Sequence, residues 1–193
     1  MTQRDEQWFK LRAGRITGSR VKAIAAGTGS QTAKNLIAGL RWERRNGVCA
    51  PTYCNADMDR GTTLEDEARL AYEIERVVIV DEVDFVIHPE YDFIGISPDG
   101  LVGDDGILEI KCPAETSAHL HQQHIDSGYY ASYYQHQITL QLACTDRQWC
   151  DVVSFYPVEG EQQPLAIWRV DRDQGAIDKL IKACIKAEKE IAK

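Results

Sequence analysis

The chain has 193 residues, of which 44% are hydrophobic and 27% charged, which is ordinary for a folded domain. This length is sufficient for one hydrophobic core, so we expect a single domain over residues 1–193. No run of about eighteen apolar residues occurs, and the first residues, MTQRDEQWFK, contain no apolar signal region. We therefore expect a protein that is neither secreted nor membrane-spanning.

Six cysteines are present without a CxxC pair. Cys49 and Cys54 are close enough in sequence to ligate zinc together, but no second Cys or His pair follows at a finger-like spacing. Reduced thiols in a cytosolic protein are the simpler expectation. The six are Cys49, Cys54, Cys112, Cys144, Cys150 and Cys184.

The net charge of −8 is distributed unevenly along the chain. Residues 1–47 hold ten Lys and Arg against three Asp and Glu, whereas residues 48–193 hold twelve against twenty-seven. This asymmetry suits a basic surface for phosphates on the first segment and carboxylates for a divalent metal on the second. Solvated charged helix faces would produce the same asymmetry, so composition alone leaves both interpretations open.

Helices are predicted at the beginning of the chain, over 4–12, 17–26 and 32–46. Thr17 is expected to cap the second, and Asn46-Gly47 to end the third. The residues expected to face inward from the first are Trp8, Phe9 and Leu11.

The middle of the chain predicts one more helix and then strands. Apolar residues at helical spacing indicate a helix over 59–75, and the β-branched run 77–89 indicates a strand. Segments 91–100 and 106–113 follow as strands, and Asp104-Asp105-Gly106 favours a tight hairpin turn before the second.

The last third returns to helices around a final strand pair. Helices are expected over 117–127 and 130–144, strands over 149–158 and 164–171, and an amphipathic helix over 173–193. The element order therefore predicts an α/β fold with a mixed β-sheet flanked by helices on both sides.

The segment GISPDGLVGDDGILEIKCP carries the candidate chemistry. Glu109 and Lys111 are two residues apart on a strand, so both side chains project from the same face. The hairpin turn brings Asp99 towards the same edge of the sheet. Two converging carboxylates repel each other unless a divalent cation lies between them.

Magnesium or manganese at such a site would lower the pKa of a bound water and make it a nucleophile towards a phosphodiester. Lys111 could orient or deprotonate that water, or offset the charge that develops on phosphorus. A surface hairpin with an ion pair between Glu109 and Lys111 would give the same pattern by chance.

Four stretches, in order, resemble the PD-(D/E)XK nucleases, and among them the lambda exonuclease and YqaJ-type viral recombinase family. This family implies a restriction-endonuclease-like fold and Mg²⁺-dependent 5′–3′ digestion of linear duplex DNA to mononucleotides. It further implies two metal ions during turnover, with Mn²⁺ as a substitute, a homotrimer, and a single-strand annealing protein as partner in phage recombination within a bacterial cytoplasm. The stretches are WFKLRAGRITGSR, RGTTLEDEARLAYE, SPDG with LEIKCP, and YYQHQITLQLACTDRQWCDVVSFY.

The resemblance also assigns site residues. Asp99 and Glu109 match the metal-binding carboxylates, Lys111 the catalytic lysine, and Ile110 a main-chain carbonyl ligand. Glu65 matches a carboxylate that helps to hold metal, although a solvated helix face explains it equally well. Gln137 matches a glutamine near the attacking water, with Gln135 and Gln141 as rivals. The residues that match the 5′-phosphate positions are Arg12, Thr17, Ser19 and, beside the active site, Ser97.

Several alternatives remain from the residues alone. Arg12 could instead pair with Asp5 or Glu6, and Ser19 could simply start a helix. The three histidines His119, His121 and His124 are expected to be solvent-exposed or close to DNA, because Mg²⁺ prefers oxygen ligands. A structure-selective or site-specific endonuclease of the same fold, and a non-catalytic module that binds DNA ends, are the competing functions.

Overall fold

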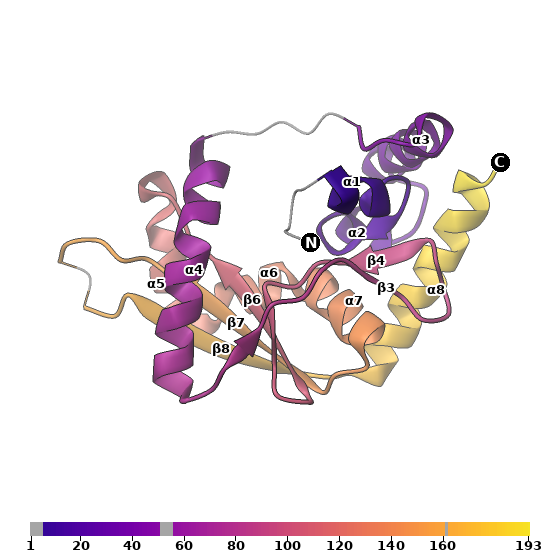
Figure 1. Ribbon diagram of the computed structural model, residues 1–193. Coiled ribbons are helices and arrows are strands. Elements are labelled where there is room, and N and C mark those ends of the chain that lie inside the picture. Colours follow the sequence, from indigo (N-terminus) through magenta and orange to yellow (C-terminus); the bar gives the residue numbers. More distant parts are fainter. Residues whose placement is uncertain (1–5, 51–55, 161) are drawn as a thin grey trace.

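A computed structural model describes residues 6–50, 56–160 and 162–193, except for the side chains of 56–62. Figure 1 shows α4 crossing the strands on one side, and the first three helices gathered beside the C-terminal helix on the other. The helices are α1 (Glu6–Arg12), α2 (Gly18–Ala25), α3 (Gln31–Asn46), α4 (Ala56–Arg76), α5 (His119–Ser127), α6 (Tyr129–Tyr133), α7 (Gln135–Thr145) and α8 (Gln174–Ile191). A 3-10 turn, Glu115–Ser117, precedes α5.

The described strands form two sheets, whereas the sequence predicts one. Three strands lie in the order β1-β4-β3, and five lie in the order β2-β5-β6-β7-β8. Each sheet is mixed, because β1 pairs with β4 and β6 with β7 in parallel while the other pairs are antiparallel. The strands are β1 (Ile16–Thr17), β2 (Val80–Asp81), β3 (Val86–Ile87), β4 (Ile94–Ile96), β5 (Gly100–Val102), β6 (Gly106–Lys111), β7 (Trp149–Phe155) and β8 (Leu165–Asp171).

Helices cover both faces of the five-stranded sheet, as predicted. Leu108 and Ile110 of β6 pack in one apolar cluster with Ala68 and Tyr72 of α4. The intervening Ile107 packs in a second cluster with residues of α6, α7 and α8. Side chains alternate between the two faces of the sheet along β6, so the even-numbered positions face α4 and the odd-numbered positions face α7.

Helix α7 lies between the two sheets and contributes to both cores. Its Leu140 and Cys144 belong to the cluster around β1 and β4, and its Ile138 and Leu142 to the cluster on β6 and β7. A helix that is apolar on two sides leaves little of its surface for polar residues. The polar residues that α7 does bury therefore need partners inside the protein.

Most of the predicted helices agree with the structure to within a few residues. Gly47 ends α3 in the left-handed conformation, with φ 67°. The expected helix over 130–144 is divided at Tyr134 into α6 and α7. Two expectations about α1 and α2 are wrong in detail: Phe9 is 42% exposed, and the Thr17 side chain makes no capping hydrogen bond.

The predicted strand over 77–89 is wrong. Val77 adopts a positive φ of 55° just after α4, and Val77 and Ile79 are exposed. Only the two-residue strands β2 and β3 form in this segment, and they belong to different sheets. The β-branched run predicts a buried strand, but here it ends a helix and connects the two sheets.

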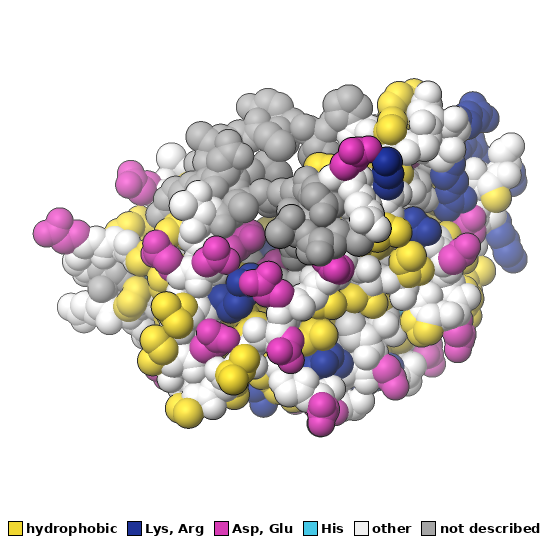
Figure 2. Space-filling model, viewed as in Figure 1, with side chains coloured by type: hydrophobic (Ala, Val, Ile, Leu, Met, Phe, Trp, Pro, Cys, Tyr) yellow, Lys and Arg dark blue, Asp and Glu magenta, His cyan; other side chains and the backbone are white. Residues whose placement is uncertain are grey.

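Positive charge is concentrated at one end of the molecule, and it comes from both segments of the chain. Figure 2 shows Lys and Arg side chains gathered near α3 and the end of α8, with Asp and Glu spread over the rest of this face. Within the described residues, no helix is both long and apolar enough to cross a membrane.

Candidate active site

Glu109 is the buried centre of the candidate site. It lies on β6 with a side chain on the α7 side of the sheet, and the residue is only 1% exposed. A buried carboxylate is costly unless hydrogen bonds or charges compensate for the lost hydration. The surroundings of Glu109 supply both.

Two glutamines on successive turns of α7 hold the Glu109 carboxylate. Gln137 Nε2 donates to Oε1 at 2.6 Å, and Gln141 Nε2 donates to Oε2 at 2.6 Å. Positions four apart lie on one face of a helix, so both amides reach the same strand residue. The structure thus places Gln137 against Glu109, and its rival Gln141 as well, whereas Gln135 is exposed.

Asp99 precedes β5 and is hydrogen-bonded to the neighbouring strand of the hairpin, β6. Its amide donates to Leu108 O at 3.1 Å, and its Oδ2 accepts from the Ile110 amide at 2.6 Å. Burial, followed by repulsion from Glu109, raises the pKa of Asp99 to about 8, although Lys111 acts in the opposite direction. The two carboxylates thus share a poorly hydrated space, where their mutual repulsion favours the binding of positive charge.

Lys111 provides the nearest cation. Its Nζ contacts Glu109 Oε1, lies 3.1 Å from Ile110 O, and sits 4.7 Å from the centre of the Tyr134 ring. Burial opposes the charge on Lys111, but Glu109 and Asp99 outweigh it and hold the pKa of Lys111 above its ordinary value. The side chain therefore remains an ammonium ion at neutral pH.

The oxygen atoms at this point fit a hard divalent cation. Among the described residues, no group of three or more His, Cys, Asp or Glu side chains is close enough to form a metal cluster. The Lys111 ammonium nevertheless occupies the place where Glu109 Oε1 and Ile110 O converge. A positive charge is therefore accommodated between a carboxylate and a carbonyl, which are the ligands that Mg²⁺ and Mn²⁺ prefer.

Glu65 approaches the same carboxylates from α4. It is half-buried, and its charge contributes to the raised pKa of Asp99. The structure thus brings Glu65 into the electrostatic surroundings of Asp99, on the opposite side of β6 from the two glutamines.

A second group of predicted residues lies around α1. Arg12 donates from its guanidinium to Ser19 Oγ at 2.7 Å and lies 4.9 Å from the centre of the Trp8 ring. Trp8 in turn donates from Nε1 to Ser97 Oγ at 3.2 Å. Arg12, Ser19 and Ser97 are therefore connected through Trp8, which the sequence predicts only to face inward.

The pairing of the parallel strands β1 and β4 places Thr17 and Ser97 at the same end of the three-stranded sheet. Thr17 is opposite Gly95 in the β1–β4 register, and Ser97 comes directly after β4. The carboxyl ends of parallel strands meet at one edge of a sheet, so these hydroxyls belong to the same edge. Thr17 is fully buried, and its Oγ1 has no hydrogen-bond partner among the described residues.

Arg12 carries its charge in a constrained environment. Burial and then repulsion from Arg20 lower its pKa to about 10, so it remains charged at neutral pH. Arg20 makes two hydrogen bonds to Glu43, at 2.9 and 2.8 Å, and is neutralised there. Arg12, by contrast, donates to a hydroxyl and lies over an aromatic ring, and the attraction of Glu43, which is already paired with Arg20, only partly offsets the lowering of its pKa. Its guanidinium is therefore suited to an anion.

The expectation for the histidines is wrong for two of the three. His121 and His124 are each 1% exposed, and only His119 is at the surface. His121 bonds to Ser154 Oγ at 2.7 Å and Gln163 O at 2.8 Å, and His124 to Val152 O at 3.0 Å. These two rings fasten α5 to the sheet and are not available to DNA.

Two comparisons with known proteins, one with family models and one with solved structures, find relatives of this chain. The family model of the YqaJ-like viral recombinase domain matches residues 7–148. An alkaline exonuclease (LHK-Exo) from Laribacter hongkongensis is 37% identical, with a TM-score of 0.87 over 97% of this chain and 93% of that one. The same relative in complex with dAMP is 38% identical, with a TM-score of 0.87 over 97% and 95%.

A more distant structure shares the fold. A phage-related exonuclease from Haemophilus somnus 129PT is 18% identical, with a TM-score of 0.77 over 92% of this chain and 93% of that one. No curated protein sequence matches the chain.

The mixed α/β fold, which this chain shares with the alkaline exonuclease, is that of the restriction-endonuclease-like class. The chain belongs to the YqaJ-like viral recombinase family.

Proposed function

We propose that the protein is a metal-dependent 5′–3′ exonuclease that digests linear duplex DNA and leaves a 3′ single strand for recombination. The observation that carries this proposal is the buried Glu109, held by Gln137 and Gln141 and paired with Lys111 beside Asp99. Membership of the family and 37% identity with an alkaline exonuclease support the same activity. The dAMP bound by that relative supports a mononucleotide product.

Asp99, Glu109 and the carbonyl of Ile110 would hold the metal, with Glu65 assisting from α4. When bound, Mg²⁺ or Mn²⁺, as two ions during turnover, would supply a water of lowered pKa and neutralise phosphate charge. A bound divalent cation would favour the ionised form of Asp99, against the burial and the repulsion from Glu109 that raise its pKa to about 8.

Lys111 would supply a positive charge beside the reacting phosphate, or would orient or deprotonate the attacking water. Its contacts with Glu109 and the Ile110 carbonyl place it next to the proposed metal ligands. An ammonium group in a poorly hydrated site stabilises the negative charge that develops on the phosphoryl oxygens. Gln137 and Gln141 keep Glu109 in one orientation, which preserves the geometry of the site.

The Arg12 group would bind the 5′ phosphate of the DNA end. Arg12 and the hydroxyls of Thr17, Ser19 and Ser97 supply charge-assisted and neutral hydrogen bonds to an anion. The unpartnered Oγ1 of Thr17 supports this role. Ser97 and Asp99 are two residues apart, so a phosphate held at the one is near the metal ligands.

The resemblance to the family supports further parts of this proposal. Residues 1–193 would form one exonuclease domain that acts as a homotrimer in the bacterial cytoplasm, with a single-strand annealing protein as partner. Sedimentation of the purified protein measures the oligomeric state directly.

The activity is tested on three matched duplexes with Mg²⁺: linear with 5′ phosphate, linear with 5′ hydroxyl, and covalently closed. We expect mononucleotides from the first, slower release from the second and none from the third. Cutting of the closed circle would instead identify an endonuclease. Absence of cleavage with every divalent metal would identify a module that only binds DNA ends.

A further inference from the structure

Tyrosine rings form a continuous aromatic surface on α6 and its junction with α7. The rings of Tyr129 and Tyr133 are stacked, with centroids 5.6 Å apart and planes at 25°. Tyr133 also meets Tyr134 edge to face at 4.9 Å. Although its ring is held by these neighbours, Tyr133 remains 48% exposed. A fixed and exposed aromatic face suits a planar ligand.

Lys22 lies over this face. It is exposed on α2, and its Nζ is 3.7 Å from the centre of the Tyr133 ring. A cation held by an aromatic face is positioned without being neutralised by a carboxylate. Its charge therefore remains available to an anionic ligand beside the ring.

A groove continues from Lys22 between α2, α7 and α8. It has a volume of about 340 Å³ and is lined by His136 and Lys179, by Gln135 and Thr139, and by small apolar residues. None of the described residues that line it is Asp or Glu, although the chain as a whole carries a net charge of −8. Burial lowers the pKa of His136, and the charges of Lys22 and Lys179 lower it further. Lys22 and Lys179 therefore form one positive region, in which the neutral form of His136 is favoured.

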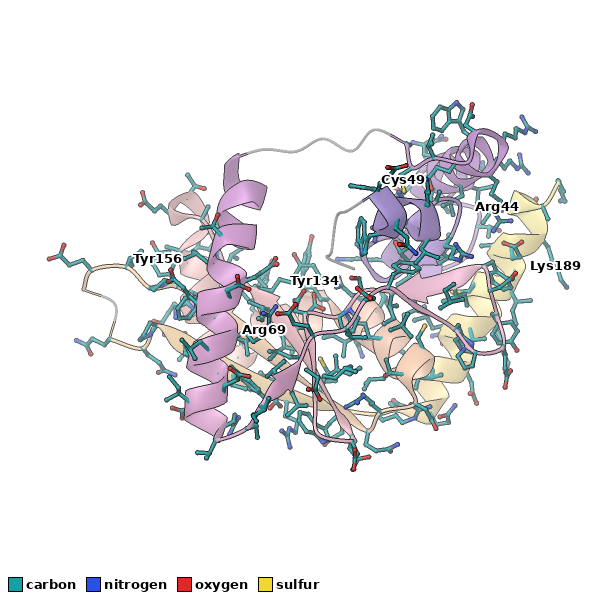
Figure 3. All side chains as sticks on the ribbon, viewed as in Figure 1. Arg44, Cys49, Arg69, Tyr134, Tyr156 and Lys189 are labelled. Carbon is teal, nitrogen blue, oxygen red and sulfur yellow. The ribbon has the colours of Figure 1, made fainter. Side chains whose placement is uncertain are left out.

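The aromatic surface begins at the candidate active site. Tyr134 contacts Tyr133 on one side and lies 4.7 Å from Lys111 Nζ on the other. Gly18, one turn before Lys22, lies so close to Gln137 that an added Cβ would be 3.0 Å from its Cγ. Figure 3 shows Tyr134 near the middle of the molecule, whereas Lys189 lies at the far end of α8.

We propose that Tyr133 and Lys22, together with the adjoining groove at His136 and Lys179, bind a single strand of DNA that leaves the active site. One base takes the place of the Lys22 ammonium over the Tyr133 ring, and Lys22 turns to a backbone phosphate, with another phosphate near Lys179. Stacking on tyrosine suits any sequence because every base has an aromatic face. This inference rests on the proposed exonuclease function, which leaves one strand unpaired at the site.

The test is the affinity for a fluorescent oligothymidine, measured by anisotropy in EDTA so that no phosphodiester is cleaved. Tyr133→Ala should weaken binding by about 5- to 150-fold, because a stacked base contributes that much. Tyr133→Phe keeps the ring and should bind like the wild type. Lys22→Ala should reduce the slope of log affinity against log salt by about 0.7, and the exposed Lys189→Ala should leave the slope unchanged.

Unchanged affinity in Tyr133→Ala would overturn the inference, as would an equal loss in Tyr133→Phe or an equal loss with blunt duplex. Digestion of linear duplex with Mg²⁺ is measured separately on the wild type. If the single strand binds as expected but no duplex is digested, the exonuclease function fails and the binding surface stands. If duplex is digested but Tyr133→Ala binds the single strand like the wild type, the binding surface fails and the exonuclease function stands.

Discussion

Gln141 Nε2 donates a 2.6 Å hydrogen bond to Oε2 of Glu109, and both residues are 1% exposed. The amide oxygen of Gln141 has no partner among the described residues, so the side chain is oriented by the carboxylate. A buried charge that loses one of its few donors is destabilised more than a neutral group would be.

We therefore predict that Gln141→Leu lowers the free energy of unfolding by about 1–3 kcal/mol, because it leaves Oε2 of Glu109 without this donor. Urea denaturation measures the change, and Gln123→Leu at an exposed position of α5 is the matched control. Equal stability of the two variants would show that the bond contributes nothing.

Lys111→Ala should slow cleavage of linear duplex by about 10²- to 10³-fold, as expected when one group that stabilises the transition state is removed. Affinity for the duplex in EDTA should stay close to that of the wild type, since the 5′-phosphate residues are intact. Single-turnover cleavage and anisotropy separate the two effects, with Lys189→Ala as the control for charge. Cleavage near the wild-type rate would remove Lys111 from the mechanism.

The site shows which features a sequence predicts well. Glu109 and Lys111 are two residues apart on a strand, and this alone predicts their contact on one face. Gln141 needs more information, because only the packing of α7 against β6 shows that the helix face shared by Gln137 and Gln141 meets Glu109. The spacing of four residues between Gln137 and Gln141 was the available signal.

Long-range pairing explains what the sequence did not predict. β4 pairs with β1, which is nearly eighty residues earlier in the chain. Because of this pairing, β4 lies in a different sheet from β5, although the two strands are close in sequence. The burial of His121 and His124 likewise depends on partners on β7 and beyond, at Ser154, Gln163 and Val152. No local pattern around these histidines contains that information.

Arg12→Ala should reduce the preference for 5′-phosphorylated over 5′-hydroxyl ends by about tenfold, because a charged hydrogen bond to the phosphate is lost. Arg12→Lys keeps the charge but loses the planar guanidinium, so its preference for 5′-phosphorylated ends should lie between those of the wild type and Arg12→Ala. Arg45→Ala, exposed in the same basic segment, is the control. The relative rates on the two linear duplexes give the ratio, and an unchanged ratio would exclude Arg12 as the phosphate ligand.

His124 should make stability depend on pH. Its Nε2 lies 3.0 Å from Val152 O, and its Nδ1 accepts from the Tyr130 amide at 3.2 Å, so the ring is bound in its neutral form. Burial lowers the pKa of His124 below its ordinary value, 6.5. The unfolded chain therefore takes up this proton more readily than the folded one.

The stabilising contribution of His124 is complete above pH 6.5 and is lost as the pH falls through the lower pKa of the folded state. We predict that His124→Gln lowers stability at neutral pH and weakens its pH dependence, by at most about 1.4 kcal/mol per pH unit. His119→Gln, exposed on the same helix, should behave like the wild type. His88 and His136 also have lowered pKa values, so the contribution of His124 is the difference between the variants in urea denaturation from pH 5 to 8. Parallel curves for His124→Gln and the wild type would show that His124 does not titrate on unfolding.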